Sequence, residues 1–81
     1  MRIDKFLKVS RILKRRSLAQ EAASGGRVKI NGKSVKPSHP VNIGDVVELG
    51  FNSGTVSLRV LDIRETVKKE DAEKLYEILS E

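Results

Sequence analysis

The feature that most constrains the fold is a change of hydrophobic period at Arg27. From Arg27 to Ile30 charged and apolar side chains alternate, and the run ends at Asn31–Gly32. Asn followed by Gly accepts the positive φ angles of a type I′ turn, so the sequence predicts a β-hairpin, with Arg27 and Lys29 on the same strand face. Before this point the apolar residues are spaced three and four apart, which is typical of helices.

Two short helices are expected before the hairpin. Asp4 stands at the start of the first, where it can cap the helix or orient Arg2 or Arg16 through an ion pair. Ser17 and Gln20 lie three residues apart and form the capping-box pattern that begins a second helix. A pair of glycines then supplies a left-handed stop. The two helices are therefore expected to meet at a basic corner.

Further strands and a last helix are expected after the hairpin. A turn is predicted at residues 42–45, followed by strands at 46–51 and 55–64, with a bulge near Val60. A C-terminal helix is expected from about Lys69, because four apolar residues follow a helical spacing: Ala72, Leu75, Tyr76 and Leu79. The expected class is α+β, with two short N-terminal helices packed on a small, mainly antiparallel β-sheet and a C-terminal helix.

Basic residues are concentrated in the first half of the chain. Residues 1–36 hold 11 of the 16 Lys and Arg residues and two acidic ones, a net charge of +9, whereas residues 37–81 carry a net charge of −4. This asymmetry predicts that one side of the protein faces a polyanion. Three aromatic residues are too few for a platform on which unpaired bases stack, so folded RNA or duplex DNA is favoured over single strands.

The sequence disfavours several other kinds of site. Without cysteine there are neither disulfides nor thiolate metal ligands, and His39, the one histidine, has no acidic residue close in sequence. No motif for nucleotide hydrolysis or nucleophilic catalysis occurs, so we expect a binding protein without a cofactor rather than an enzyme. Charges interrupt the apolar residues of the N-terminus, which argues against a signal peptide or membrane span and predicts a cytoplasmic protein.

An ordered series of short motifs resembles a known family, the S4 RNA-binding domain, also called the alpha-L motif. The matching stretches are, in chain order, RIDKFL (2–7), RRSLAQ (15–20), SGGRVKINGK (24–33), VKPS (35–38) and GD (44–45). The resemblance implies an alpha-L RNA-binding fold with its core motif at about residues 2–49. Further strands and the C-terminal helix would then occupy residues 50–81, all within a single RNA-binding domain of residues 1–81. Family membership implies binding of structured RNA through the two helices and the following loop.

Within this family, the chain is most similar to stand-alone members that act in ribosome-associated quality control. The similarity implies a monomer that binds large-subunit rRNA and peptidyl-tRNA on the free large ribosomal subunit after stalling. It also implies RqcH, the factor that adds a C-terminal tail to the nascent chain, as a partner on the same subunit, and no membrane partner. Heat-shock protein fifteen, a relative that binds such subunits, is the alternative. It typically has a longer, basic C-terminal extension, whereas the C-terminus here is acidic.

The residues expected to contact RNA all lie in the first 33 positions. They are Arg2, Lys5, Lys8, Arg11, Lys14, Arg15, Arg16, Ser17, Gln20, Arg27, Lys29 and Lys33. The family resemblance points first to Arg2 and Arg16. Because each neutralised phosphate releases counterions, affinity should fall with salt with a log–log slope of about −0.7 to −0.9 per contact.

Two other functions fit parts of the pattern. Two short helices with a basic corner superficially resemble a DNA-reading helix-turn-helix, and a preference for duplex DNA over transfer RNA at equal salt would favour that function. The second helix is, however, rich in alanine and poor in side chains that read a groove. The same domain is also appended to pseudouridine synthases, but 81 residues leave no room for their catalytic domain.

Overall fold

The structure is a computed structural model that describes residues 1–12, 27–51 and 54–80. In chain order the described elements are helix α1 (Ile3–Val9), strands β1 (Arg27–Ile30), β2 (Lys33–Ser34), β3 (Val46–Phe51) and β4 (Gly54–Val60), the 3-10 helix η2 (Lys69–Leu75) and strand β5 (Tyr76–Ser80). The second helix expected from Ser17 lies outside the described residues. The α+β class with a helix ahead of an antiparallel sheet is confirmed.

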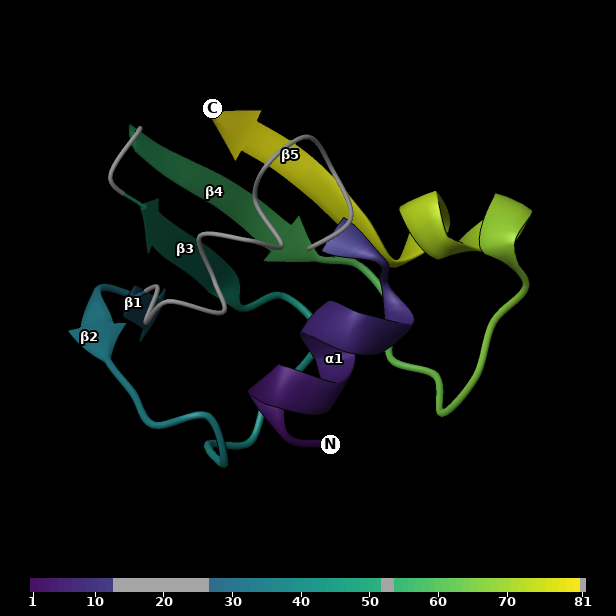
Figure 1. The fold of residues 1–81 in the computed structure, drawn as a ribbon, viewed down its shortest axis with the longest axis horizontal. Helices are drawn as coiled ribbons and strands as arrows, with labels where there is room; N and C mark the ends of the chain where they lie inside the picture. Colours follow the sequence, from purple (N-terminus) through teal and green to yellow (C-terminus); the bar gives the residue numbers. More distant parts are fainter. Residues whose placement is uncertain (13–26, 52–53, 81) are drawn as a thin grey trace.

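The five strands form one sheet in the order β2-β1-β3-β4-β5, and each neighbouring pair is antiparallel. The predicted hairpin joins β1 to β2, and its turn residues Asn31 and Gly32 have φ angles of 53° and 85°. Figure 1 shows the sheet as a twisted layer, with α1 packed beside it and the chain ends far apart. Strands β1 to β3, which begin within the expected core motif of residues 2–49, and strands β4 and β5, which follow it, therefore belong to the same sheet.

One face of the sheet carries the hydrophobic core. Because side chains alternate along a strand, every second residue of β3 and β4 points to the same side, and that side packs against the apolar stripe of α1. The core cluster consists of Ile3, Phe6, Leu7, Ile12, Ile30, Val41, Val47, Leu49, Leu58, Val60, Leu75 and Tyr76. Phe6 is completely buried, so α1 is anchored through the residues that the helical spacing selected.

Two neighbouring turns are tied together by an asparagine. The predicted turn at residues 42–45 is present: the Asn42 N–H donates to Asp45 Oδ2 at 2.9 Å, and Gly44 has a φ of 93°. The Asn31 amide nitrogen donates to Asp45 Oδ1 at 3.1 Å, while its Oδ1 accepts the Val46 N–H at 3.0 Å. The β1–β2 turn is therefore held against the start of β3.

The prediction of a C-terminal helix is wrong beyond Leu75. Residues Lys69–Leu75 form a 3-10 helix, and Tyr76–Ser80 pair with β4 as an antiparallel edge strand. The spacing of the apolar residues fitted both structures, since Tyr76 and Ile78 also alternate, opposite Val60 and Leu58. The backbone groups along the free edge of β4 gain hydrogen-bond partners from a strand but not from a helix, so tertiary pairing overrides the local helical pattern.

The second long strand is also shorter than predicted. It ends at Val60 rather than near residue 64, because the Leu61 N–H donates to the Leu75 carbonyl at 2.8 Å and the chain turns toward η2. The bulge expected near Val60 lies instead between Ser57 and Leu58, in the pairing of β4 with β5.

Candidate nucleic-acid interface

Helix α1 presents a basic side to solvent. Its apolar residues face the core, which leaves Lys5 and Lys8 exposed. The loop before β3 supports the start of the helix: the Ile3 N–H donates to the His39 carbonyl at 2.8 Å, and the Asp4 N–H donates to the Pro37 carbonyl at 3.1 Å. These bonds satisfy amides that a helix leaves without partners at its N-terminus.

Asp4 both orients Arg2 and accepts a backbone amide at the start of the helix. Arg2, rather than Asp4, occupies the N-cap position and makes no side-chain capping bond, but Asp4 Oδ1 accepts the Lys5 N–H at 2.8 Å. The Arg2 guanidinium donates to both carboxylate oxygens of Asp4, at 3.1 and 2.9 Å. Both side chains are exposed, so this pair contributes little stability, but its two-point geometry fixes the direction of the guanidinium. Arg2 keeps further N–H groups with which a phosphate can bond.

Lys5 is paired with an acidic residue from far along the chain. Its ammonium group donates to Glu65 Oε2, and Glu65 lies in the segment between β4 and η2, which passes beside α1 (Figure 1). The hydrogen bond from Lys5, together with its positive charge, lowers the pKa of Glu65. A phosphate that binds Lys5 must therefore compete with Glu65. The sequence offered no signal for this pair, because sixty residues separate its members.

Arg11 lies in a backbone conformation that usually belongs to glycine. It follows α1 with a φ of 59°, and its N–H donates to the Lys8 carbonyl at 3.1 Å, which closes the last turn. A left-handed residue is a common way to end a helix, but a side chain there clashes with the following carbonyl oxygen. The chain therefore holds an arginine where glycine is the less strained choice.

The basic residues of the hairpin do not all share a face with α1. Along β1, Arg27 and Lys29 are exposed, while Val28 is half-buried and Ile30 is buried against the core. Alternation therefore places Arg27 and Lys29 on the sheet face opposite α1. Lys33 lies across from Ile30 on β2, on the α1 side, and is exposed.

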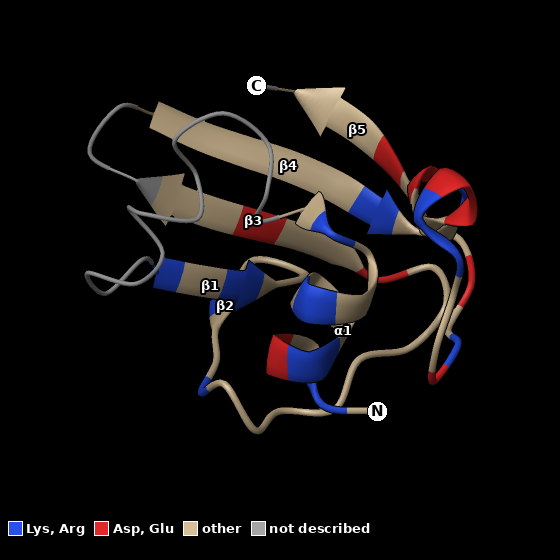
Figure 2. Cartoon of the chain, turned by 45° about the vertical axis from the view of Figure 1, so that its right-hand side comes forward, with Lys and Arg blue, Asp and Glu red and all other residues tan. Residues whose placement is uncertain are grey.

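The structure thus divides the described members of the predicted site into two groups. Figure 2 shows Lys and Arg on α1 and on β1–β2, with most of the acidic positions gathered around η2. Arg2, Lys5, Lys8 and Arg11 lie on or next to α1, and Lys33 on β2 lies on the same side of the sheet as α1. Arg27 and Lys29 lie on the other side of the sheet. The remaining predicted contacts lie outside the described residues: Lys14, Arg15, Arg16, Ser17 and Gln20.

Two basic residues were missing from the predicted site. Lys36 is exposed, and with Lys33 and His39 it lines a hollow beside the hairpin. Arg59, on β4, shares the sheet face of Arg27 and Lys29. A strict reading of strand alternation would have identified Arg59, because it lies between the apolar residues Leu58 and Val60.

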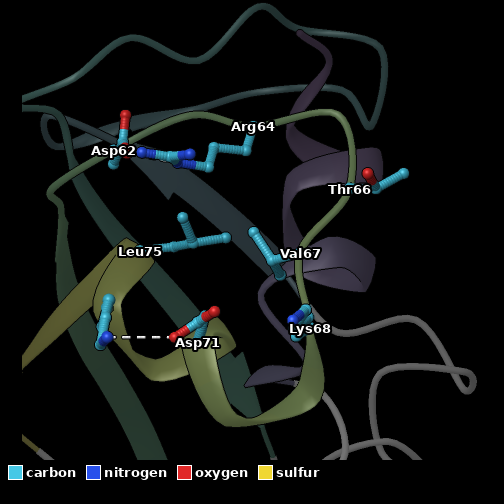
Figure 3. A pocket seen from close by; sticks show the side chains of 8 residues that line it. Asp62, Arg64, Thr66, Val67, Lys68, Asp71 and Leu75 are labelled. Atoms are coloured by element: carbon cyan, nitrogen blue, oxygen red, sulfur yellow. Dashed lines mark hydrogen bonds and ion pairs between the residues drawn. The ribbon is translucent and has the colours of Figure 1, made fainter.

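A second hollow lies between η2 and the preceding segment. Leu75 and Val67 form its apolar floor, and charged pairs form its rim (Figure 3). The Arg64 guanidinium donates to Asp62 Oδ2 at 2.8 Å; this hydrogen bond lowers the pKa of Asp62 and raises that of Arg64. Within residues 1–12, 27–51 and 54–80, no three acidic, histidine or cysteine residues cluster as metal ligands would, and no helix is long and apolar enough to cross a bilayer.

Comparison with known proteins identifies relatives over the full length of the chain. The model of the S4 domain matches residues 1–47. The RQC P-site tRNA stabilizing factor of Streptococcus pneumoniae is 48% identical over 81 residues, which is all of this chain and 92% of that protein. The protein of the same name from Bacillus subtilis is also 48% identical, over all of this chain and 94% of its own length.

A second group of relatives consists of proteins named Heat shock protein 15. The Heat shock protein 15 homolog of Aeromonas salmonicida is 36% identical over 95% of this chain, which corresponds to 59% of that protein. Among solved structures, the trimeric structure of Vibrio cholerae Heat Shock Protein 15 is similar, with a TM-score of 0.75 and 32% identity over 99% of this chain and 82% of that one.

Proposed function

We infer the function from the family: the chain belongs to the S4 domain family and, within it, to the RQC P-site tRNA stabilizing factors. It is an RNA-binding protein of ribosome-associated quality control. It binds rRNA and peptidyl-tRNA on stalled free large ribosomal subunits and supports C-terminal tailing of the nascent chain. The observation that carries this conclusion is the match at 48% identity that spans all 81 residues.

We propose that the basic residues of α1 and the hairpin bind the RNA. Lys8, Lys29 and Lys33 are exposed on elements packed to the same core, so each of them meets the RNA that it contacts in a fixed position. Arg2 is oriented by Asp4 before RNA binds, which reduces the conformational entropy lost on binding. The corner residues Arg15 and Arg16 complete the proposed site.

Further parts of the proposal concern partners and organisation. RqcH works beside this protein on the same subunit, and the protein acts as a cytoplasmic monomer that catalyses no reaction. We also propose that residues 1–81 form a single RNA-binding domain, because strands before and after residue 49 share one sheet. Light scattering on the purified protein tests the monomer, and a trimer like that of the Vibrio relative would contradict it.

Co-sedimentation tests the proposed function. Tagged protein should migrate with large subunits that carry peptidyl-tRNA, and Arg16→Ala or Arg2→Ala should abolish this association. Arg64→Ala is a matched control, because Arg64 is paired with Asp62 at the edge of the η2 hollow. Migration with small subunits alone, or equal loss in the control, would contradict the proposal.

A heat-shock-type rescue factor is the second candidate, supported by the similarity to Heat Shock Protein 15. The two candidates differ in when they act. A quality-control factor should associate with obstructed subunits during ordinary growth and should be needed for tail addition. A heat-shock factor should associate mainly after a temperature rise, and its deletion should leave tail addition intact.

A further inference from the structure

The sheet has a second face, turned away from α1, on which basic residues are exposed. Arg27 and Lys29 lie on it in β1, and Arg59 lies on it in β4. The strand register sets their neighbours. Gly50 on β3 lies directly opposite Arg27, and Thr55 on β4 lies opposite Gly50. Lys29 lies between Ser34 on β2 and Glu48 on β3. We call this face the outer surface, defined by Arg27, Lys29, Ser34, Thr55, Ser57 and Arg59.

We propose that the outer surface is a second RNA-binding surface, which holds the sugar–phosphate backbone of an RNA segment other than the one bound along α1. The inference rests on the proposed function and extends it, because it assigns two RNA contacts to two faces of one small domain. It also adds Arg59 and three hydroxyl residues to the binding site.

The cations of the outer surface are available to a phosphate. Among the described residues no carboxylate lies within ion-pair distance of Arg27 or Lys29, and Arg59 approaches Glu77 only to 3.8 Å. Arg2 and Lys5, on α1, are both held in hydrogen-bonded ion pairs. Within the part of the chain that the structure describes, a phosphate at Arg27 or Lys29 therefore does not have to displace an ion-paired carboxylate, although Glu48 lies across from Lys29 and Glu77 lies across from Arg59 on the same face.

The surroundings of Arg27 leave room for a backbone to approach. Its neighbour in register, Gly50, has no side chain, and a Cβ added there would lie 3.7 Å from Arg27 Cβ. The next residue across the sheet, Thr55, is small and exposed. Threonine and serine hydroxyls both donate and accept hydrogen bonds, so they fit phosphate oxygens and the 2′-hydroxyl of RNA.

The chemistry of the surface favours RNA over an acidic protein. A protein interface needs a buried apolar or aromatic centre. Among the described residues the apolar side chains on this side of the sheet are Val46 in β3 and the exposed Leu79 in β5, which strand β4 separates, so they form no continuous apolar centre. RNA backbone recognition needs spaced cations and hydroxyl groups without an apolar anchor. Among the residues that the structure describes, no aromatic side chain lies on this face, so stacking of unpaired bases is not part of the proposal.

A single stiff RNA helix does not reach both surfaces. The sheet and the core layer separate Lys8 from Lys29, and the shortest dimension of the Cα trace is 22 Å. A rigid duplex pressed against α1 leaves the outer surface free for another RNA segment. The same arrangement lets one protein hold two RNA elements in a fixed relation.

Site-specific crosslinking tests the proposal. A photoreactive residue replaces Ser57, at the centre of the outer surface, or Lys8, on α1, in the full chain bound to large subunits that carry peptidyl-tRNA. Sequencing of the attached RNA should give different segments for the two positions. Identical nucleotides from both, or crosslinks from Ser57 to protein alone, would overturn the second surface. If neither position crosslinks to RNA, the proposed function itself fails.

Charge-neutral variants supply a second measurement. The pair R27Q/K29Q should weaken subunit binding about tenfold and make the log–log salt slope shallower by about 1.4 to 1.8, as expected for two lost phosphate contacts. The control pair R64Q/K68Q removes the same charge beside η2 and should change affinity less than twofold. If both pairs weaken binding equally, only the net charge of the protein affects binding, and the proposal is overturned. Circular dichroism melts verify that both variants remain folded.

Discussion

Arg11 offers a test in which stability and RNA binding should move in opposite directions. Its φ of 59° places a side chain in the left-handed region, at a cost of about 1 to 2 kcal/mol. Arg11→Gly removes that strain, but glycine loses about 0.5 to 1 kcal/mol more conformational entropy on folding. The expected gain is therefore about 0.5 to 1 kcal/mol, equivalent to a rise in Tm of roughly 2 to 8 °C for a domain of this size.

The same substitution should weaken RNA binding. Removing one phosphate contact of a half-buried arginine near the surface costs about 1 kcal/mol, which is a fivefold loss of affinity. Arg11→Ala is the matched control, since it also deletes the side chain and its charge but keeps a Cβ at the positive φ. Alanine should lose the same affinity as glycine without the rise in Tm.

Thermal melts followed by circular dichroism and tRNA binding at fixed salt measure the two effects. If Arg11→Gly melts no higher than Arg11→Ala, the strain does not exist and the stability argument fails. If glycine is more stable and binds RNA as tightly as the unmodified chain, Arg11 is not a contact residue. Only the combination of higher stability and weaker binding supports an arginine kept at this position for RNA.

Three further predictions concern the packing and charges of the described residues. In an NMR titration Lys5→Ala should return the pKa of Glu65 to its ordinary range, and an unchanged pKa would show that the ion pair is absent. The ion pair stabilises the fold at pH values above the ordinary glutamate pKa, and this stabilisation is lost as the pH falls through the lowered pKa of Glu65. Phe6→Ala should lower the free energy of unfolding by about 3 to 5 kcal/mol in a denaturant titration, whereas the control Lys8→Ala should lower it by less than about 0.5 kcal/mol. A similarly small loss for Phe6→Ala would mean that α1 is not anchored in the core. In the same assay Asn31→Ala should lower the free energy of unfolding by about 2 to 3 kcal/mol and Asn31→Gly by about 1 kcal/mol. Both variants lose the side-chain hydrogen bonds, but only alanine is strained at the positive φ, so equal losses would contradict that backbone conformation.

Sequence reasoning was most successful where a local rule has one outcome. The pair Asn31–Gly32 requires positive φ angles, and the alternation before it assigns two faces, so the hairpin was predictable residue by residue. It failed at Tyr76–Ser80, where the apolar spacing fits a helix and a strand equally well. The deciding factor there is the free edge of β4, which is a property of the assembled sheet.

The division of the basic residues between two faces follows from the same alternation, combined with the position of the core. The alternation along β1 places Arg27 and Lys29 on one face of the strand and Ile30 on the other. The apolar face must be covered, and the amphipathic helix α1 covers it. Basic residues on the helix and on the strand are then separated by the core between them. A single binding face would require Arg27 and Lys29 to share the side of Ile30, where each would take the place of an apolar side chain of β1. A small domain that is basic on both elements is therefore driven by its own packing toward two charged surfaces, and this is the property that a bridge between two RNA segments requires.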